Sequence, residues 1–283
     1  MSGLGFRYEG NAYDRRFLPR LTTGEIAAMP KDDALIVLPV GAVEQHGPHM
    51  PVFTDTLIGE ALMAEAFEHL PADAPIWLLP SVGYGKSTEH AEHPGTITLS
   101  ARTLMAVLED IAASLARSGF KKLLLFNTHG GNADLLGMMA REIRIATGMA
   151  VYRLDPGAVG YSESFTDDEE KASGIHAGDV ETSLVMAVCP DWVHPERAVR
   201  EMPNFPRSPS FSFRAKSFAW TMKDISASGI AGDATKANPA RGRAMLDRAG
   251  PLLAGALLEI AAFDMGSLKE SPLREPSYKA SSV

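Results

Sequence analysis

The sequence has almost no cysteine and no long apolar run, and both absences limit the classes of protein to which it can belong. The single cysteine, Cys189, excludes an intrachain disulfide, so nothing in the composition calls for an oxidising compartment. No stretch reaches 18 uninterrupted apolar residues, which excludes an apolar membrane-spanning helix. The first ten residues lack the charged and apolar regions of a signal peptide. We therefore expect a cytoplasmic protein without a membrane partner.

Runs of lysine and arginine are also missing. The chain has 27 basic and 35 acidic residues, which give a formal net charge of -8. A duplex-binding protein normally carries a basic face, so we expect no nucleic-acid partner, although a nucleotide-like small substrate stays compatible with this composition. There is no internal repeat and no low-complexity boundary in the 283 residues. This favours one domain over 1–283, with a core at about 15–265 and a polar C-terminal tail after Ser267.

Apolar runs of strand length alternate with longer helical patterns. The runs predict strands at 34–40, 75–80, 121–126 and 149–154. The helical patterns lie at 55–70, 100–118, 132–147, 179–188 and 239–263. Ser100 is a suitable N-cap, and Gly119 is a helix-ending residue. Continuous apolar strands separated by helices indicate an α/β protein whose mostly parallel sheet is covered on both faces. The stretch 201–229, rich in Ser, Pro and aromatic residues, is expected to be a long loop.

Polar clusters follow three of the predicted strands, where parallel sheets usually bind their ligands. They are GAVEQHGPH at 41–49 with Asp55 beyond it, GYGKSTEHAEHPG at 83–95, and NTHGGN at 127–132. Buried carboxylates and imidazoles need partners, and a divalent cation such as Zn, Mn or Fe(II) is a suitable one. Taken singly, Asp55 also fits a helix N-terminal acid, and Gly130-Gly131 also fits a tight turn. The Gly-Lys-Ser triplet at 85–87 lacks the upstream glycine of a phosphate-binding loop.

Three sequence blocks resemble the creatininase family of amidohydrolases. They are PVGAVEQHGPH at 39–49 with Asp55, NTHGGN at 127–132, and HAGDVETS at 176–183. Weaker similarity lies at 89–97 and 229–233, so the likeness spans about residues 15–265. The resemblance implies a three-layer α/β/α fold and an active site with two divalent metal ions.

The resemblance also implies which residues hold the metals. Four ligands of the family correspond to Glu44, His46, Asp55 and His129, with Asp55 bridging the two ions. Creatininase itself has a glutamate two residues after that histidine, where this chain has Gly131. The glycine-containing branch of the family takes its last carboxylate from the later block, which is Glu181 here. This departure argues against creatinine as the substrate.

The implied reaction is hydrolysis of a C–N bond by a hydroxide that the metals activate. We expect Glu181 to belong to both the metal site and the catalytic machinery, and His176 to protonate the leaving nitrogen as a general acid. The alternative role of His176 is to cap a helix or to brace the loop in which it lies. Glu89 and His90 are expected either to support the metal ligands or to contact the substrate. Further substrate contacts are expected from Trp220 and from the backbone N–H groups of Gly130, Gly131 and Asn132. The family further implies a homo-oligomer, commonly a hexamer.

Three functions fit these features. The first is an amidohydrolase that cleaves a small cyclic amide, formamide or related carbonyl substrate. The second is a hydrolase of a C–C bond in a keto-inositol, which occurs in the same family. The third is a non-catalytic metal- or ligand-binding protein, against which the full ligand set argues.

Overall fold

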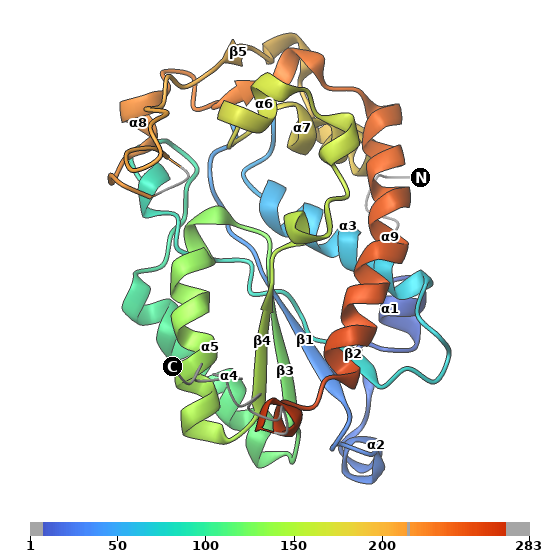
Figure 1. Ribbon diagram of the computed structural model, residues 1–283. Helices are drawn as coiled ribbons and strands as arrows, with labels where there is room; N and C mark the ends of the chain where they lie inside the picture. The colour runs from blue at the N-terminus through green and yellow to red at the C-terminus, as the bar shows by residue number, and fades with distance from the viewer. Residues whose placement is uncertain (1–7, 214–215, 270–283) are drawn as a thin grey trace, which may run out of the picture.

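The computed structural model describes residues 8–213 and 216–269, and its helices and strands alternate along the chain as predicted (Figure 1). The strands are β1 Leu35–Val40, β2 Ile76–Leu78, β3 Lys122–Asn127, β4 Ala150–Leu154, β5 Arg200–Glu201 and β6 Gly232–Asp233. The longer helices are α3 Thr54–Glu68, α4 Ala101–Arg117, α5 Ala133–Thr147, α7 Asp179–Val188 and α9 Pro239–Ala262. The shorter ones are α1 Asn11–Asp14, α2 Thr23–Ala28, α6 Asp168–Ser173 and α8 Met222–Ile225.

Four strands form the central sheet in the order β2-β1-β3-β4, and every neighbouring pair is parallel. The β1–β3 pair has the longest register, from Leu35 opposite Lys122 to Val40 opposite Asn127. All six residues of β1 are buried. A parallel strand covered on both faces needs apolar side chains at every position, which explains its unbroken LIVLPV sequence.

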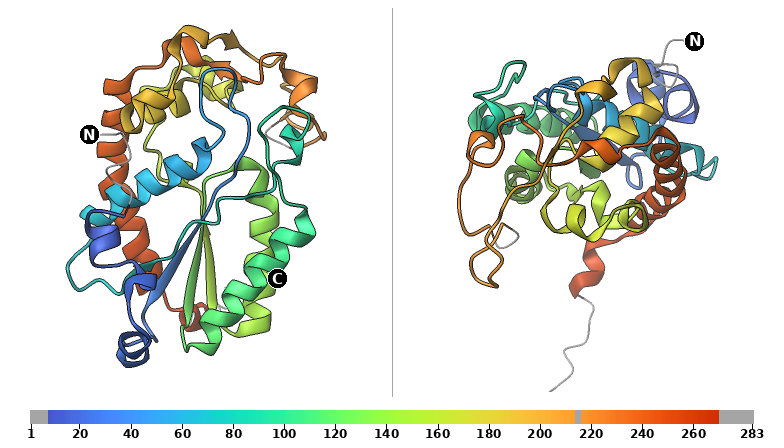
Figure 2. Two further views of the ribbon diagram at one scale, coloured as in Figure 1. Left: turned by 180° about the vertical axis from the view of Figure 1, so that it is seen from behind. Right: turned by 90° about the horizontal axis from the view of Figure 1, so that it is seen from above.

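Alternate residues of the sheet face two different apolar cores. Leu35 and Val37 pack with buried residues of α3, α7 and α9, whereas Ile36 and Leu38 pack with those of α4 and α5. Figure 2 shows these two groups of helices on opposite sides of the strands. The predicted three-layer α/β/α fold is therefore confirmed.

Most predicted elements are present, with shifted ends. Ser100 caps α4 by accepting a hydrogen bond from the N–H of Thr103. The predicted strand at 75–80 is shorter, because prolines stand at both of its ends and cannot donate to the ladder. The predicted helix at 132–147 begins at Ala133, after a 3-10 turn over Gly130–Asn132.

The stretch 201–229 is mostly irregular, as expected, but it contains α8 and begins in the two-residue strand β5. Strand β5 pairs antiparallel with β6, beyond the carboxyl end of the central sheet (Figure 1). Most of the predicted polar tail lies outside the described residues. None of the described helices is both long and apolar enough to cross a membrane.

Candidate metal centre

The polar clusters meet above the carboxyl ends of β1 and β3. Glu44 and His46 follow β1, and Asp55 lies in the first turn of α3. His129 follows β3 directly, and Glu181 lies in the first turn of α7. The structure thus brings together all five residues that the resemblance implies as metal ligands, from four separate segments of the chain.

Asp55 lies between two histidines. Its Oδ1 is 3.3 Å from Nε2 of His46, and its Oδ2 is 3.1 Å from Nδ1 of His129. Each carboxylate oxygen therefore faces a different imidazole. This is the arrangement that a carboxylate shared by two cations requires.

The two remaining carboxylates complete the cluster. Glu44 Oε2 is 3.3 Å from Nδ1 of His129, and Glu44 Oε1 is 3.9 Å from Nε2 of His46. Glu181 Oε2 is 3.9 Å from the same nitrogen of His46. The side chains of Glu44, His46 and Asp55 are at most 4% exposed, whereas that of Glu181 is 31% exposed. Glu181 is therefore the most exposed of the five residues of the cluster.

Backbone carbonyls orient both histidines. His46 Nδ1 lies 3.0 Å from the carbonyl oxygen of Glu44, and His129 Nε2 lies 3.1 Å from that of Lys86. A carbonyl oxygen only accepts hydrogen bonds, so these two nitrogens donate. The opposite nitrogens, which face the carboxylates, are then available as ligands. Metal-binding histidines are usually held in this way.

Three buried atoms at the centre of the cluster have no hydrogen-bond partner among the described residues: Glu44 Oε2, His46 Nε2 and Asp55 Oδ2. Leaving such atoms unpaired away from water is costly. Three overlapping groups of donor atoms lie close enough together to hold a cation: Glu44, His46 and His176; Glu44, Glu89 and His129; and His46, Asp55 and Glu181. These observations fit divalent cations as the missing partners.

The crowded carboxylates of the cluster shift the pKa values of the neighbouring histidines. Burial disfavours the charged form of His46, but Asp55, Glu181 and Glu44 outweigh it and raise the pKa of His46 to about 9. The pKa of His129 is likewise raised despite burial, because Glu44 and Asp55 face it. The pKa of Asp55 is lowered, since the two imidazoles outweigh its desolvation. The carboxylates of the cluster thus favour positive charge at its centre, which divalent cations would supply.

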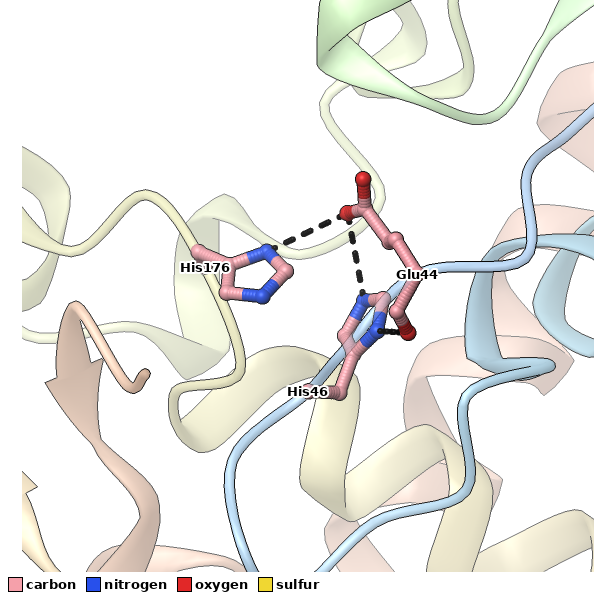
Figure 3. Close-up of side chains that lie close together, drawn as sticks. All are labelled: Glu44, His46 and His176. Carbon is pink, nitrogen blue, oxygen red and sulfur yellow. Dashed lines mark hydrogen bonds and ion pairs between the residues drawn. The ribbon is translucent and has the colours of Figure 1, made fainter. Parts of the chain in front are cut away.

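His176 stands beside the cluster with its two nitrogens in different roles (Figure 3). Its Nε2 lies 2.7 Å from the carbonyl oxygen of Gln45 and must donate to it. Its Nδ1 lies 3.5 Å from Glu44 Oε1. Burial and the neighbouring His46 and His90 hold the pKa of His176 well below its usual range. The neutral form of the ring is therefore favoured, with its proton on Nε2 and with Nδ1 facing Glu44.

Gln45 is a central residue that the sequence reasoning missed. Its Nε2 lies 2.8 Å from Nδ1 of His90 and 2.9 Å from the carbonyl oxygen of Gly229, and its Oε1 accepts from the N–H of Gly47. One signal was present, because Gln45 is the only glutamine in the chain and it separates Glu44 from His46. Through these contacts the side chain ties the β1 loop to two other segments.

The predicted substrate residues fall into two groups. Glu89, Gly130, Gly131 and Trp220 line a cavity of about 640 Å³, together with Phe213 and Phe218. His90 and Asn132 are instead buried against the protein. His90 Nε2 lies 3.7 Å from Glu44 Oε1. The Asn132 side chain donates to the carbonyl of Gly41 and accepts from the N–H of Lys86, so it braces three loops.

A second cavity, of about 310 Å³, is lined by both His176 and Glu181, with Tyr161 and Glu170 among its other walls. The loop that carries His176 is held in an unusual conformation, because Ala177 has a φ of 52°. That conformation lets the N–H of Ala177 donate to Glu181 Oε2 at 2.6 Å. Backbone strain of this kind is typical of functional sites. Two residues of the candidate site, His176 and Glu181, thus border this cavity.

Comparison with known proteins agrees with this geometry. The family model for creatininase, described as creatinine amidohydrolase, matches residues 19–257. The chain is 32% identical to a mycofactocin precursor peptide peptidase from Mycobacterium tuberculosis over 82% of this chain and 89% of that protein. It is 32% identical to a creatinine amidohydrolase from Pseudomonas putida over 66% of this chain and 77% of that protein. A 3-dehydro-scyllo-inosose hydrolase from Thermotoga maritima is 27% identical over 66% of this chain and 60% of its own length.

Solved structures give the same assignment. A putative creatinine amidohydrolase from Bacteroides fragilis superposes with a TM-score of 0.73 at 25% identity, over 91% of this chain and 99% of that one. A structure described as creatininase Mn has a TM-score of 0.70 at 27% identity, over 87% of this chain and 99% of that one. A creatininase mutant described as the Zn-Zn type has a TM-score of 0.67 at 28% identity, over 87% of this chain and 98% of that one. The sequence blocks, the fold and the family match agree, and this chain belongs to the creatininase family.

Proposed function

We propose that the protein is a metal-dependent amidohydrolase that cleaves a C–N bond of a small cyclic amide, a formamide or a related carbonyl substrate. Its centre would hold two divalent ions, Zn, Mn or Fe, on Glu44, His46, Asp55, His129 and Glu181. The observation that carries this proposal is the position of Asp55, whose two oxygens face His46 and His129 at 3.3 and 3.1 Å. Family relatives described as Mn and Zn-Zn forms support the choice of metals.

Divalent ions bound there would lower the pKa of water and stabilise negative charge on a carbonyl oxygen. The protein's own contribution begins with His176. Because its Nε2 donates to Gln45, the transferable proton belongs to Nδ1, which faces the cluster. The neutral ring first accepts a proton there from the attacking water and then donates it to the leaving nitrogen. His176 thus acts first as a general base and then as a general acid.

Glu181 shapes access to the reacting atoms. It is the one proposed ligand with a substantially exposed side chain, and it lines a cavity with His176. A carbonyl group that enters this cavity meets the cluster and the Nδ1 atom of His176 together. Placing the electrophile and the proton carrier in one cavity removes much of the entropic cost of bringing them together.

Cleavage of a C–C bond in a keto-inositol is the second candidate. It is supported by the 27% identical relative described as a 3-dehydro-scyllo-inosose hydrolase. The same arrangement of an electrophile above the cluster and a proton carrier at His176 would serve that reaction, with carbon in place of nitrogen as the leaving atom. A non-catalytic binding role is disfavoured, because all five donors are present and converge.

Metal analysis tests the class of the enzyme. Protein purified without chelator is expected to carry two equivalents of Zn, Mn or Fe per chain, and Asp55→Ala is expected to lose them. Asp55→Asn, which keeps the size of the side chain, guards against a folding defect. Asp110→Ala is the matched control, since Asp110 is exposed on α4. Full hydrolytic activity in the metal-free protein would overturn the proposal.

A substrate screen separates the two reactions. Cyclic amides, formamides and keto-inositols would be offered to the metal-loaded protein and to His176→Gln. Turnover of an amide with release of an amine supports the first candidate, and turnover of a keto-inositol alone supports the second. Substitution of His176 is expected to lower kcat by about 10²- to 10⁴-fold.

A further inference from the structure

His129 is surrounded on both sides, and the side away from the cluster has its own carboxylate. Nε2 of His129 lies 3.1 Å from Ser87 Oγ, 3.1 Å from the carbonyl oxygen of Lys86 and 3.4 Å from Glu89 Oε1. Nδ1, on the opposite edge of the ring, faces Glu44 and Asp55. One imidazole therefore links an inner pair of carboxylates to an outer one.

Glu89 is fixed in this outer position. Its second oxygen, Oε2, lies 3.8 Å from the ammonium group of Lys86, and its side chain is only 15% exposed. Glu89 Oε1 is thus held close to Nε2 of His129, on the edge of the ring that faces away from the cluster.

Gly131 provides the space that Glu89 occupies. A Cβ atom added at position 131 would overlap Glu89 Oε1, and it would also lie 2.5 Å from Nε2 of His129 and 2.6 Å from the carbonyl oxygen of Lys86. The neighbouring Gly130 is different, because an added Cβ there meets nothing within 4 Å. Two adjacent glycines in one turn therefore have different roles, and only the second lies too close to Glu89, His129 and the Lys86 backbone to carry a side chain.

From this geometry we propose that Glu89 is a positioning residue that accepts the Nε2–H of His129 and directs Nδ1 towards a cation, with Gly131 leaving room for it. The proposal rests on the metal-dependent function proposed above. A carboxylate behind a metal-binding histidine fixes the ring and increases its basicity, and loss of such a partner typically weakens metal binding 10- to 100-fold. The Lys86 carbonyl and the Ser87 hydroxyl share this edge of the ring with Glu89, and among the three only Glu89 brings negative charge. Glu89 faces Nε2, away from the Nδ1 edge where Glu44 and Asp55 lie, so it supports the ring and leaves the cation to the residues at Nδ1.

The test compares the affinity of metal-free protein for Zn²⁺ and Mn²⁺, measured by competition with a chelator. Glu89→Gln keeps the size of the side chain but removes its charge, and is expected to bind about 10- to 100-fold more weakly than the wild type. Glu92→Gln, three residues along and paired with Lys223 at the surface, is the matched control and is expected to bind like the wild type. The unfolding temperature of metal-free Glu89→Gln should equal that of the wild type.

Substitution of the two glycines gives a second test of the proposal. Gly131→Ala is expected to weaken metal binding, and Gly130→Ala to leave it unchanged. In a Glu89→Ala background, Gly131→Ala should cost less than it does in the wild type, because the carboxylate it displaces is already gone.

The outcomes separate this inference from the proposed function. If Glu89→Gln binds both metals within twofold of the wild type, Glu89 has no positioning role. If the wild type binds neither metal, the proposed metal-dependent function is wrong, and the inference about Glu89 is wrong with it. If only the stability of metal-free Glu89→Gln falls, with affinity intact, the residue is a structural brace and the inference is wrong.

Discussion

At the scale of single residues, the centre depends on side chains that never need to touch a substrate. Gln45 spans three segments, since its amide contacts His90, the carbonyl of Gly229 and the N–H of Gly47. Carbonyl oxygens of Glu44 and Lys86 set the orientation of His46 and His129. Contacts with the backbone therefore hold the side chains of the centre in place. They also provide hydrogen-bond partners for the polar residues of the β1 loop, which are buried.

Replacing Gln45 by methionine tests this dependence. The side chain keeps its length but loses its polar atoms, so the carbonyl of Gly229 and the N–H of Gly47 lose their partner in a buried environment. We expect the free energy of unfolding of the metal-free protein to fall by about 1–3 kcal/mol. Urea denaturation measures this change. Unaltered stability would mean that water replaces the amide without cost.

At the scale of elements, helix α7 is positioned from behind by α9. Gly242 of α9 packs so closely on α7 that an added Cβ would overlap the carbonyl oxygen of Ser183 and would lie 3.0 Å from the Cβ of Ala187. Glu181 lies on the same short helix, two residues before Ser183. The close approach of the two helices thus determines how far Glu181 reaches into the cluster.

Two glycine substitutions in α9 are expected to have opposite effects. Gly242→Ala should destabilise the protein by about 1–3 kcal/mol, because backbone atoms of α7 have to move. Gly255→Ala should stabilise it by about 0.5–1 kcal/mol, since an added Cβ there meets nothing within 4 Å and alanine favours the helix. Thermal unfolding of both variants, followed by metal titration, distinguishes them. Weakened metal binding is expected only in Gly242→Ala, and equal effects would contradict this account of the packing.

Strand β5 stabilises another loop of the site through Glu201. Its carboxylate accepts hydrogen bonds from the hydroxyl of Ser226, the N–H groups of Ala227 and Ser228, and the hydroxyl of Ser228. These bonds outweigh partial burial and lower the pKa of Glu201 to about 2. Gly229, which follows directly, presents its carbonyl to Gln45. The acid thus holds the loop that contacts the β1 segment.

The pKa of Glu201 predicts a pH-dependent contribution to stability. Because its folded-state pKa lies below the ordinary value of 4.5, the contribution is complete above pH 4.5 and is lost as the pH falls towards 2. Glu201→Gln should therefore be less stable than the wild type at pH 7 by about 1 kcal/mol, allowing for solvent screening. The difference should shrink between pH 4.5 and 2 in urea denaturation. Glu196→Gln, at an exposed site, should show no such trend.

At the scale of the whole molecule, local sequence patterns predicted the sheet and the edge at which the polar residues gather. Apolar runs such as LIVLPV determine strands by themselves, and parallel strands place their following loops together. A supporting role was one of two predicted for Glu89, but its contact with His129 and the bridging amide of Gln45 were not predictable. Each depends on contacts between residues at least 40 positions apart, and no local periodicity records such contacts.

The whole fold should also respond to removal of metal, because the cluster joins segments from four parts of the chain. Three buried atoms at its centre have no hydrogen-bond partner among the described residues. Ligands that bind only the folded state stabilise it, by about 4 kcal/mol at a concentration 1,000 times the dissociation constant. We therefore expect chelation to lower the unfolding temperature by roughly 10 °C, with recovery when Zn²⁺ or Mn²⁺ is returned. Calorimetry with and without chelator measures the shift. Asp55→Asn should show little of it, and an equal shift in that variant would place the stabilising metal elsewhere.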